Sequence, residues 1–194
     1  MKAGVRQLLG LAVAIISFAV TILICALPQW KVLKVQGSGS GDSTVYSRGL
    51  WQLCVTDNMY GTRCFIYENA PITQDLKAAR ALIIIAIIVG FTGILLGVAG
   101  SKFISFVPDE RKKSKMAMAS GVVFFIASLF VLIPVCWITN TINDNFNYER
   151  SPGSPDSLKW VLGASIYIGW ITTGLWFLGG GLLCSSFLCR DGTD

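Results

Sequence analysis

Four long apolar runs alternate with polar segments along this chain. The runs cover about residues 8–27, 78–100, 116–138 and 160–184. Each has the roughly 20 residues that a helix needs to cross a bilayer about 30 Å thick. The pattern therefore predicts four membrane-spanning helices, with polar loops at 28–77, 101–115 and 139–159 and a polar tail at 185–194.

The first and longest polar loop has the period-two alternation of β-strands. Trp51, Leu53 and Val55 fall on one face at period two, and Arg63, Phe65 and Tyr67 repeat this spacing after a turn-rich link ending at Gly61. Two strands joined in this way bring Cys54 beside Cys64, so we predict a disulfide that closes the hairpin. A loop of this size contributes roughly 2–3 kcal/mol, mainly by restricting the unfolded chain. With the strands expected near residues 30–35 and 44–46, the loop forms a small antiparallel sheet.

Charge agrees with this topology. The 194 residues are 53% hydrophobic and 14% charged, and the formal net charge is +5. The charges stand beside the apolar runs, so we interpret them by the positive-inside rule and not as a nucleic-acid surface. Loop 101–115 holds five lysines and arginines and is expected to be cytoplasmic. Both termini are then cytoplasmic, and the cysteine hairpin faces the oxidising exterior, where a disulfide persists.

An enzyme is not predicted. The expected spans hold no carboxylate or histidine for proton transfer or metal binding, and the chain has no C-x-x-C pair for redox exchange. We therefore expect no catalytic residue, cofactor or metal site. The partner that the composition implies is membrane lipid.

Several residues at fixed places along the chain resemble the signature of the claudin family, and the likeness extends over nearly the whole chain. These residues are Trp30, Gly49, Leu50, Trp51, Cys54, Cys64 and Arg80. The W…GLW…C…C pattern is shared with a wider tetraspan superfamily, whereas the loop lengths and the start of the fourth span favour claudins.

The resemblance implies a membrane α+β fold in which a four-transmembrane-helix bundle carries an extracellular antiparallel β-sheet. It also implies tight junction strands, which polymerise in cis and adhere in trans to seal or selectively conduct the paracellular space. Partners would be further copies of this chain and other claudins. The alternative is a tetraspan auxiliary subunit that modulates another membrane protein or channel. The tail ends in Gly192-Thr193-Asp194, so a PDZ scaffold is not expected to bind through it.

Four charged residues of the first loop are candidates for setting paracellular ion selectivity. Asp57, three residues after Cys54, resembles the pore-lining carboxylate of cation-conducting claudins. It is equally interpreted as a turn residue that binds its own backbone. The cationic candidates are Lys31, Lys34 and Arg63.

The second loop and the spans supply the remaining candidates. Phe146 and Tyr148, with Leu158, resemble family positions that contact a neighbouring protomer, although a simple interfacial belt is an alternative. Pro134 is expected to bend the third span near its outer end. Cys184 and Cys189 suit S-palmitoylation, and Cys184 equally suits helix packing. The stripe of glycines at 90, 93, 97 and 100 suits packing within the monomer or self-association.

Overall fold

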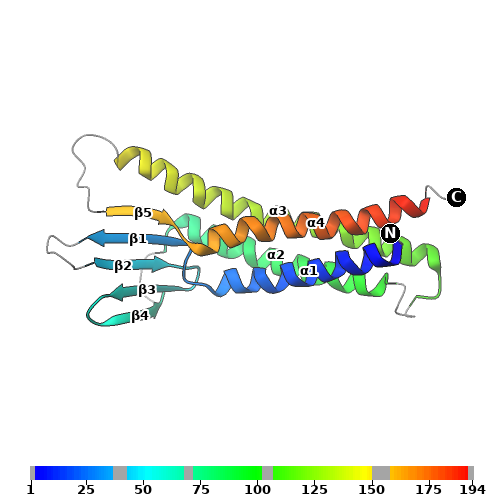
Figure 1. The fold of residues 1–194 in the computed structure, drawn as a ribbon, viewed down its shortest axis with the longest axis horizontal. Coiled ribbons are helices and arrows are strands. Elements are labelled where there is room, and N and C mark those ends of the chain that lie inside the picture. Colours follow the sequence, from blue (N-terminus) through cyan, green and yellow to red (C-terminus); the bar gives the residue numbers. More distant parts are fainter. Residues whose placement is uncertain (1–2, 37–42, 68–71, 102–106, 150–157, 192–194) are drawn as a thin grey trace. The chain divides into compact units, whose positions relative to one another are not determined.

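The computed structural model describes residues 3–36, 43–67, 72–101, 107–149 and 158–191. At residues 3, 36, 146–149, 158–159 and 189–191 it describes only the backbone. The described residues form four helices, α1 (Ala3–Ala26), α2 (Gln74–Ala99), α3 (Glu110–Glu149) and α4 (Ala164–Asp191) (Figure 1). They also form five strands, β1 (Lys31–Gln36), β2 (Ser43–Arg48), β3 (Gln52–Asp57), β4 (Gly61–Ile66) and β5 (Leu158–Leu162).

Each of these four helices contains a segment long and apolar enough to cross a membrane. The segments are Gly4–Ala26, Gln74–Ala99, Glu110–Asn145 and Ala164–Leu188. Together with the sheet, they confirm the predicted fold class of a membrane α+β protein with four spans.

The chain divides into two compact units. The helical unit comprises Met1–Ile22, Leu82–Leu132 and Ile171–Asp194, and the sheet unit comprises Leu23–Ala81 and Ile133–Trp170. All the strands belong to the sheet unit, while each of the four helices contributes residues to both units.

In the helical unit, the glycine stripe of α2 faces other helices of the same chain. A Cβ added to Gly93 would lie 2.7 Å from the Phe124 ring of α3, and the Ser120 hydroxyl donates a 2.7 Å hydrogen bond to the Gly93 carbonyl. A Cβ added to Gly90 would lie 2.8 Å from the ring of Trp176 in α4. The stripe therefore packs within the monomer, as small residues do wherever helix backbones approach closely.

Trp176 is the largest side chain at the centre of this unit, and it is fully buried. Its ring centroid lies 5.3 Å from that of Phe124, and its Nε1–H donates a 3.1 Å hydrogen bond to the Thr21 hydroxyl of α1. A buried indole N–H needs such a partner, because leaving it unpaired costs about 1–3 kcal/mol.

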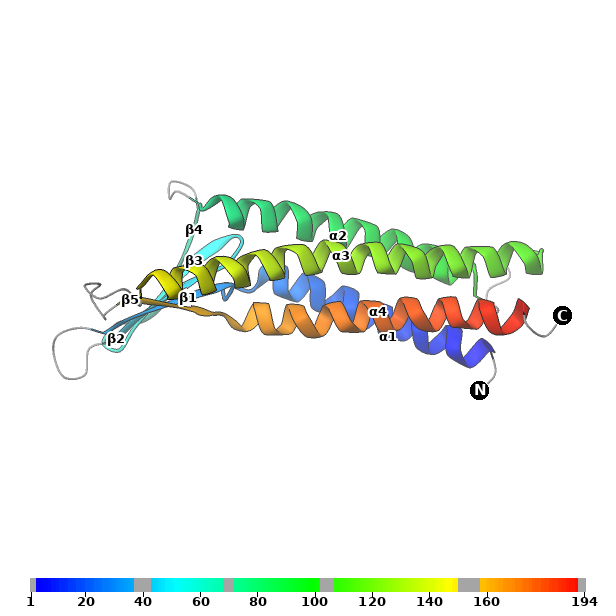
Figure 2. The ribbon, with the colours of Figure 1, turned by 90° about the horizontal axis from the view of Figure 1, so that it is seen from above.

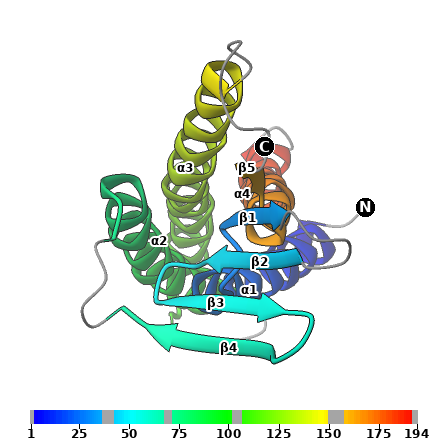
Figure 3. The same cartoon turned by 90° about the vertical axis from the view of Figure 1, so that its left-hand side faces the viewer.

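The sheet unit is built on five antiparallel strands in the order β4-β3-β2-β1-β5 (Figure 3). Strands β1 to β4 follow one another as a meander. Strand β5 comes from the far end of the sequence and pairs with β1, with Leu33 opposite Trp160. Residues 158–162 were expected to end the second loop and begin the fourth span, so this expectation is wrong. Trp160, Val161 and Leu162 are apolar enough for a span, but their aromatic and β-branched side chains also suit an edge strand.

The third helix is also longer than the apolar pattern indicates. Residues 139–149 were assigned to a loop, yet α3 continues to Glu149 (Figure 2). Thr139 and Thr141 bind the carbonyls of Val135 and Trp137, four residues earlier, at 2.7 and 3.0 Å. These local bonds satisfy polar side chains within the helix, so the end of an apolar run marks the end of hydrophobicity and not of the helix. Pro134 is buried inside α3, and the bend expected there stays a prediction.

The segment Pro28–Trp30 runs between two glycines. A Cβ on Gly49 would overlap the backbone of Pro28, and a Cβ on Gly163 would overlap the carbonyl of Gln29. Main-chain hydrogen bonds join the same stretches, from Trp30 N to Arg48 O at 2.9 Å and from Gly163 N to Trp30 O at 3.2 Å. Both positions require glycine because three chain segments meet there backbone to backbone.

Candidate functional site

The hairpin β3–β4 is closed by the predicted disulfide. Cys54 and Cys64 are direct partners in the antiparallel register, with Cα atoms 4.0 Å apart, and form the bond. The prediction from spacing and strand alternation is therefore confirmed. The bond ties β4, whose six residues are all exposed, to the interior strand β3.

The Gly49–Leu50–Trp51 turn is held by Arg80 of α2. Arg80 Nε donates a 3.0 Å hydrogen bond to the Leu50 carbonyl, and its guanidinium lies 4.4 Å from the centre of the Trp51 ring. The Trp51 Nε1–H donates to the Cys25 sulfur at 3.4 Å. A cation between a carbonyl and an aromatic face is well satisfied away from water. Arg80 thus bonds the base of the sheet.

Two further contacts hold this base. Trp30 is fully buried, and its Nε1–H donates a 2.8 Å hydrogen bond to the Ile24 carbonyl. The Tyr67 hydroxyl donates to the Gly49 carbonyl at 3.3 Å. Burial raises the pKa of Tyr67, against the opposing charges of Arg48 and Arg80, so the phenol stays protonated as a donor.

The four charge candidates differ in their access to solvent. Lys31 is buried and forms an ion pair with Asp75 of α2, whereas Lys34 on the same strand is exposed. A buried, paired cation contributes little to the potential that a mobile ion meets. Of the two lysines, we therefore keep Lys34 as a candidate for ion selectivity and treat Lys31 as structural.

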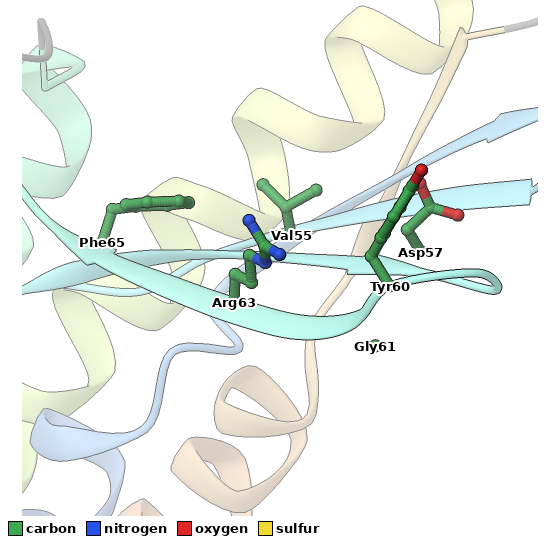
Figure 4. Close-up of a pocket in the computed structure, with 6 residues that line it drawn as sticks. All are labelled: Val55, Asp57, Tyr60, Gly61, Arg63 and Phe65. Carbon is green, nitrogen blue, oxygen red and sulfur yellow. The ribbon is translucent and has the colours of Figure 1, made fainter.

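Asp57 and Arg63 lie on the same face of the hairpin. In an antiparallel ladder, directly opposed residues share a face, and so do residues two apart on one strand. Val55 opposes Arg63, and Asp57 opposes Gly61. This face is hollowed into a shallow pocket of about 330 Å³. It is lined by Val55, Asp57, Tyr60, Gly61, Arg63 and Phe65 (Figure 4).

The two opposite charges in this pocket are offset along the strands. Figure 4 shows the Arg63 side chain beside Val55, and the Asp57 carboxylate beside the Tyr60 ring at the turn. Within the described residues, no ion pair joins Asp57 to Arg63. Asp57 Oδ1 accepts a 3.2 Å hydrogen bond from the Met59 N–H. Asp57 is therefore both a turn residue and a pocket residue, since the hydrogen bond in the turn fixes the carboxylate that lines the pocket.

The expected protomer contacts have a different setting from the one predicted. Phe146 and Tyr148 were expected on a short loop, but both belong to α3. Leu158 belongs to β5. The side chains of all three lie outside the described residues, so their contacts stay a prediction.

The two candidate palmitoylation sites both fall in α4. The side chain of Cys189 lies outside the described residues. Cys184 is half-buried, and a Cβ added to Gly121 of α3 would lie 2.7 Å from its sulfur. This contact favours helix packing for Cys184.

Sequence reasoning missed Asp75 as the partner of Lys31, and Trp160 as the partner of Arg48. The Arg48 guanidinium lies 5.1 Å from the centre of the Trp160 ring. Neither pair has a sequence signal, because the partners lie 44 and more residues apart in the sequence and meet only in the folded chain. Tyr60 was also missed as a pocket residue, although its place in the hairpin link was evident.

The fold and the site define a class: a tetraspan membrane protein whose disulfide-closed sheet is locked at its base by an arginine and two tryptophans. The sequence model of the PMP-22/EMP/MP20/Claudin family matches residues 4–183. The chain belongs to this family.

Its relatives include claudins of several vertebrates. The chain is 41% identical to Claudin-4 of Homo sapiens over 190 residues, which cover 97% of this chain and 88% of that protein. It is 41% identical to the Claudin-like protein ZF-A89 of Danio rerio over 179 residues, covering 92% and 85%. Claudin-6 of Homo sapiens is 37% identical over 193 residues, covering 99% and 86%.

This membership gives the chain its broad role. Claudins are tight junction proteins, and the family supports a strand-forming role at tight junctions over that of an auxiliary subunit. The protein is membrane-embedded and associates with copies of itself or with other claudins, and its family is structural rather than enzymatic.

Proposed function

We propose that the hollowed face of the β3–β4 hairpin lines the paracellular path of the strands that this protein forms. The observation that carries this proposal is the placement of Asp57 and Arg63 on one exposed face of a hairpin closed by a disulfide. Charges on a rigid support keep their position when ions pass. A ring or row of such charges selects ions by sign.

The offset between the two charges gives the path two local potentials. An exposed ion pair would largely neutralise itself, but no such pair joins Asp57 to Arg63 within the described residues. Bulk salt screens exposed charges beyond about 8 Å, so each charge acts on ions that pass close to it, and the charge nearer the narrowest point has the larger effect. A constriction near Asp57 prefers cations, and one near Arg63 prefers anions.

The orientation of the chain follows from charge and redox chemistry. One span separates the disulfide loop from the basic segment 101–115, so the two lie on opposite sides of the membrane. The basic segment favours the cytoplasm, and the disulfide favours the exterior. Both termini are then cytoplasmic, and the hairpins of opposed cells face one another across the intercellular gap.

Adhesion and polymerisation use other parts of the chain. Phe146 and Tyr148 supply apolar surface for contacts with a neighbouring protomer, together with Leu158. The segment after the fourth span carries Cys189 as the acylation candidate.

Expression in cells that lack junctions tests this function. Freeze-fracture imaging should reveal continuous intramembrane strands at contacts between expressing cells. The matched control is Cys54→Ser/Cys64→Ser, which removes the hairpin closure and should leave scattered particles or none. A wild-type chain that reaches the cell surface and forms no strands would contradict the proposal.

A further inference from the structure

The first turns of α3 carry a dense group of cations. Arg111, Lys112, Lys113 and Lys115 fall within five residues, against the carboxylates of Asp109 and Glu110. The positive-inside rule explains why such residues lie on the cytoplasmic side. It does not explain in which direction they point, and the structure adds that information.

The cations occupy two different faces of α3. Arg111, Lys112 and Lys115 are exposed, and Lys115 is a neighbour of both others on the helix surface because it follows them by four and three residues. Lys113 is half-buried on the other side, where a Cβ added to Gly100, just after α2, would lie 2.9 Å from the Lys113 carbonyl. Three of the four cations thus point away from the helix packing of the helical unit.

The exposed cations continue directly into an exposed apolar stripe. Counting from Arg111 in steps of three or four residues, the stripe passes through Lys115, Met118, Val122, Ile126 and Leu129. The exposed fractions of its last four side chains are 39, 44, 42 and 48%. In contrast, Ala117, Phe124 and Ala127 on the packed face are buried. In a membrane-spanning helix, such an outward apolar stripe contacts acyl chains, so the cations above it lie at the depth of lipid headgroups.

The four cations outnumber the two nearby carboxylates, so the first turns of α3 keep a net positive charge, and one of those carboxylates, that of Asp109, also caps the helix. Its Oδ1 accepts a 3.1 Å hydrogen bond from the Arg111 N–H, and its main-chain carbonyl accepts one from the Lys113 N–H at 3.1 Å. These bonds also satisfy backbone donors of the first turn. The positive character of the surface therefore rests on side chains and not on free helix N–H groups.

We propose that Arg111, Lys112 and Lys115 form a binding surface for anionic phospholipid headgroups, with Met118, Val122 and Ile126 contacting the acyl chains below. Clustered cations next to a membrane span attract anionic lipids, each contributing to the affinity over a range set by salt. A polyphosphorylated headgroup fits best because three cations on one face offer several donors to one compact anion. This surface is independent of the hairpin and of strand formation.

Titration of the purified full-length protein with a fluorescent phosphatidylinositol 4,5-bisphosphate in mixed micelles tests the proposal. Arg111→Gln/Lys112→Gln/Lys115→Gln should weaken binding about 100-fold, given the usual contribution of each cation. The matched control is Lys34→Gln/Arg63→Gln/Lys77→Gln, which removes the same charge from exposed residues of the sheet unit and should leave binding nearly unchanged. Lys112→Arg/Lys115→Arg should retain binding, which separates charge from folding.

Two competition arms identify the source of the phosphate. Phosphatidylcholine should not displace the probe, and water-soluble inositol trisphosphate should compete roughly tenfold or more weakly than the lipid, because it lacks acyl chains. If the free headgroup competes as strongly as the lipid, the surface binds phosphate groups alone and does not recognise a lipid. If the triple variant and its control lose the same amount of affinity, binding depends on the net charge of the protein and not on this surface. Either result would overturn the proposal.

Discussion

Lys31 of β1 and Asp75 of α2 form an ion pair in which the two side chains are only 9 and 10% exposed. The pair joins the first strand to the first turn of a helix 44 residues later. It is the ion pair whose loss has the largest expected effect among the described residues, because surface pairs contribute little and this one is withdrawn from water.

Removing one member of the pair should therefore cost more than removing both. Asp75→Asn leaves the Lys31 ammonium buried without a counter-charge and should destabilise the protein by about 3–5 kcal/mol. Lys31→Met/Asp75→Leu replaces both charges by apolar side chains of similar volume and should lie near the wild type. Thermal unfolding in detergent, followed by tryptophan fluorescence, measures both. The control Lys34→Met, at an exposed position of the same strand, should change stability by less than about 0.5 kcal/mol. An Asp75→Asn variant that melts with the wild type would mean that water reaches the pair.

The disulfide and the orientation can be tested together by thiol labelling. Alkylation of the non-reduced protein should leave Cys54 and Cys64 unmodified, and Cys54→Ser/Cys64→Ser should lose roughly 2–3 kcal/mol of stability. In intact cells, an impermeant reagent should label a cysteine introduced at Ser38 and not one introduced at Ser114. Labelling at Ser114 alone would reverse the proposed topology. Permeabilised cells, in which both positions should react, provide the control.

Dilution potentials across a monolayer test the proposed paracellular face. Asp57→Asn should lower the permeability ratio of sodium to chloride, and Arg63→Gln should raise it, because the two charges act with opposite sign on one path. Since the structure does not pair them, their effects should add, and the ratio of the double variant should lie between those of the two single variants. Lys77→Gln, an exposed cation outside the hairpin, should change nothing. Unchanged ratios in both single variants would leave Asp57 as a turn residue only.

The helical position of Phe146 and Tyr148 changes the adhesion prediction. Because α3 continues through both positions, they are two residues apart on a helix and not on a flexible loop. We expect Phe146→Ala and Tyr148→Ala to differ, with only one of them reducing enrichment at cell–cell contacts while surface expression is kept. Quantitative imaging against a surface-biotinylation control measures this. Equal losses would indicate two separate contacts, and no loss in either variant would favour the interfacial belt.

The sequence predicts the spans and the hairpin well, because both depend on local patterns. Apolar length reports a membrane span, and strand alternation with a turn places Cys54 opposite Cys64. The residues at which helices and strands begin and end are harder to predict from the sequence. The sequence does not indicate that the threonine hydroxyls of α3 bind carbonyls of the same helix. The segment around Trp160 suits a membrane span or a strand equally, and its pairing with β1 decides for the strand.

In the candidate site, too, some features could be predicted from the sequence and others could not. Asp57 and Arg63 could be placed on the hairpin from the sequence alone, and their offset follows from the register once the disulfide fixes it. The burial of Lys31 could not be foreseen, because it depends on Asp75 reaching it from another element. Charge at a given position can be read from sequence, whereas exposure requires the tertiary contacts.

The two glycines that enclose Pro28–Trp30 restrict how this protein can vary. On the proposed paracellular face of the hairpin the charged residues are partly or fully exposed, so substitutions there should change the proposed ion preference with little effect on folding. At Gly49 and Gly163 even a methyl group collides with main-chain atoms that have nowhere to move. A harmful variant at either glycine would therefore act by preventing assembly of the sheet, whereas a substitution on the proposed hairpin face would act on the ions that pass.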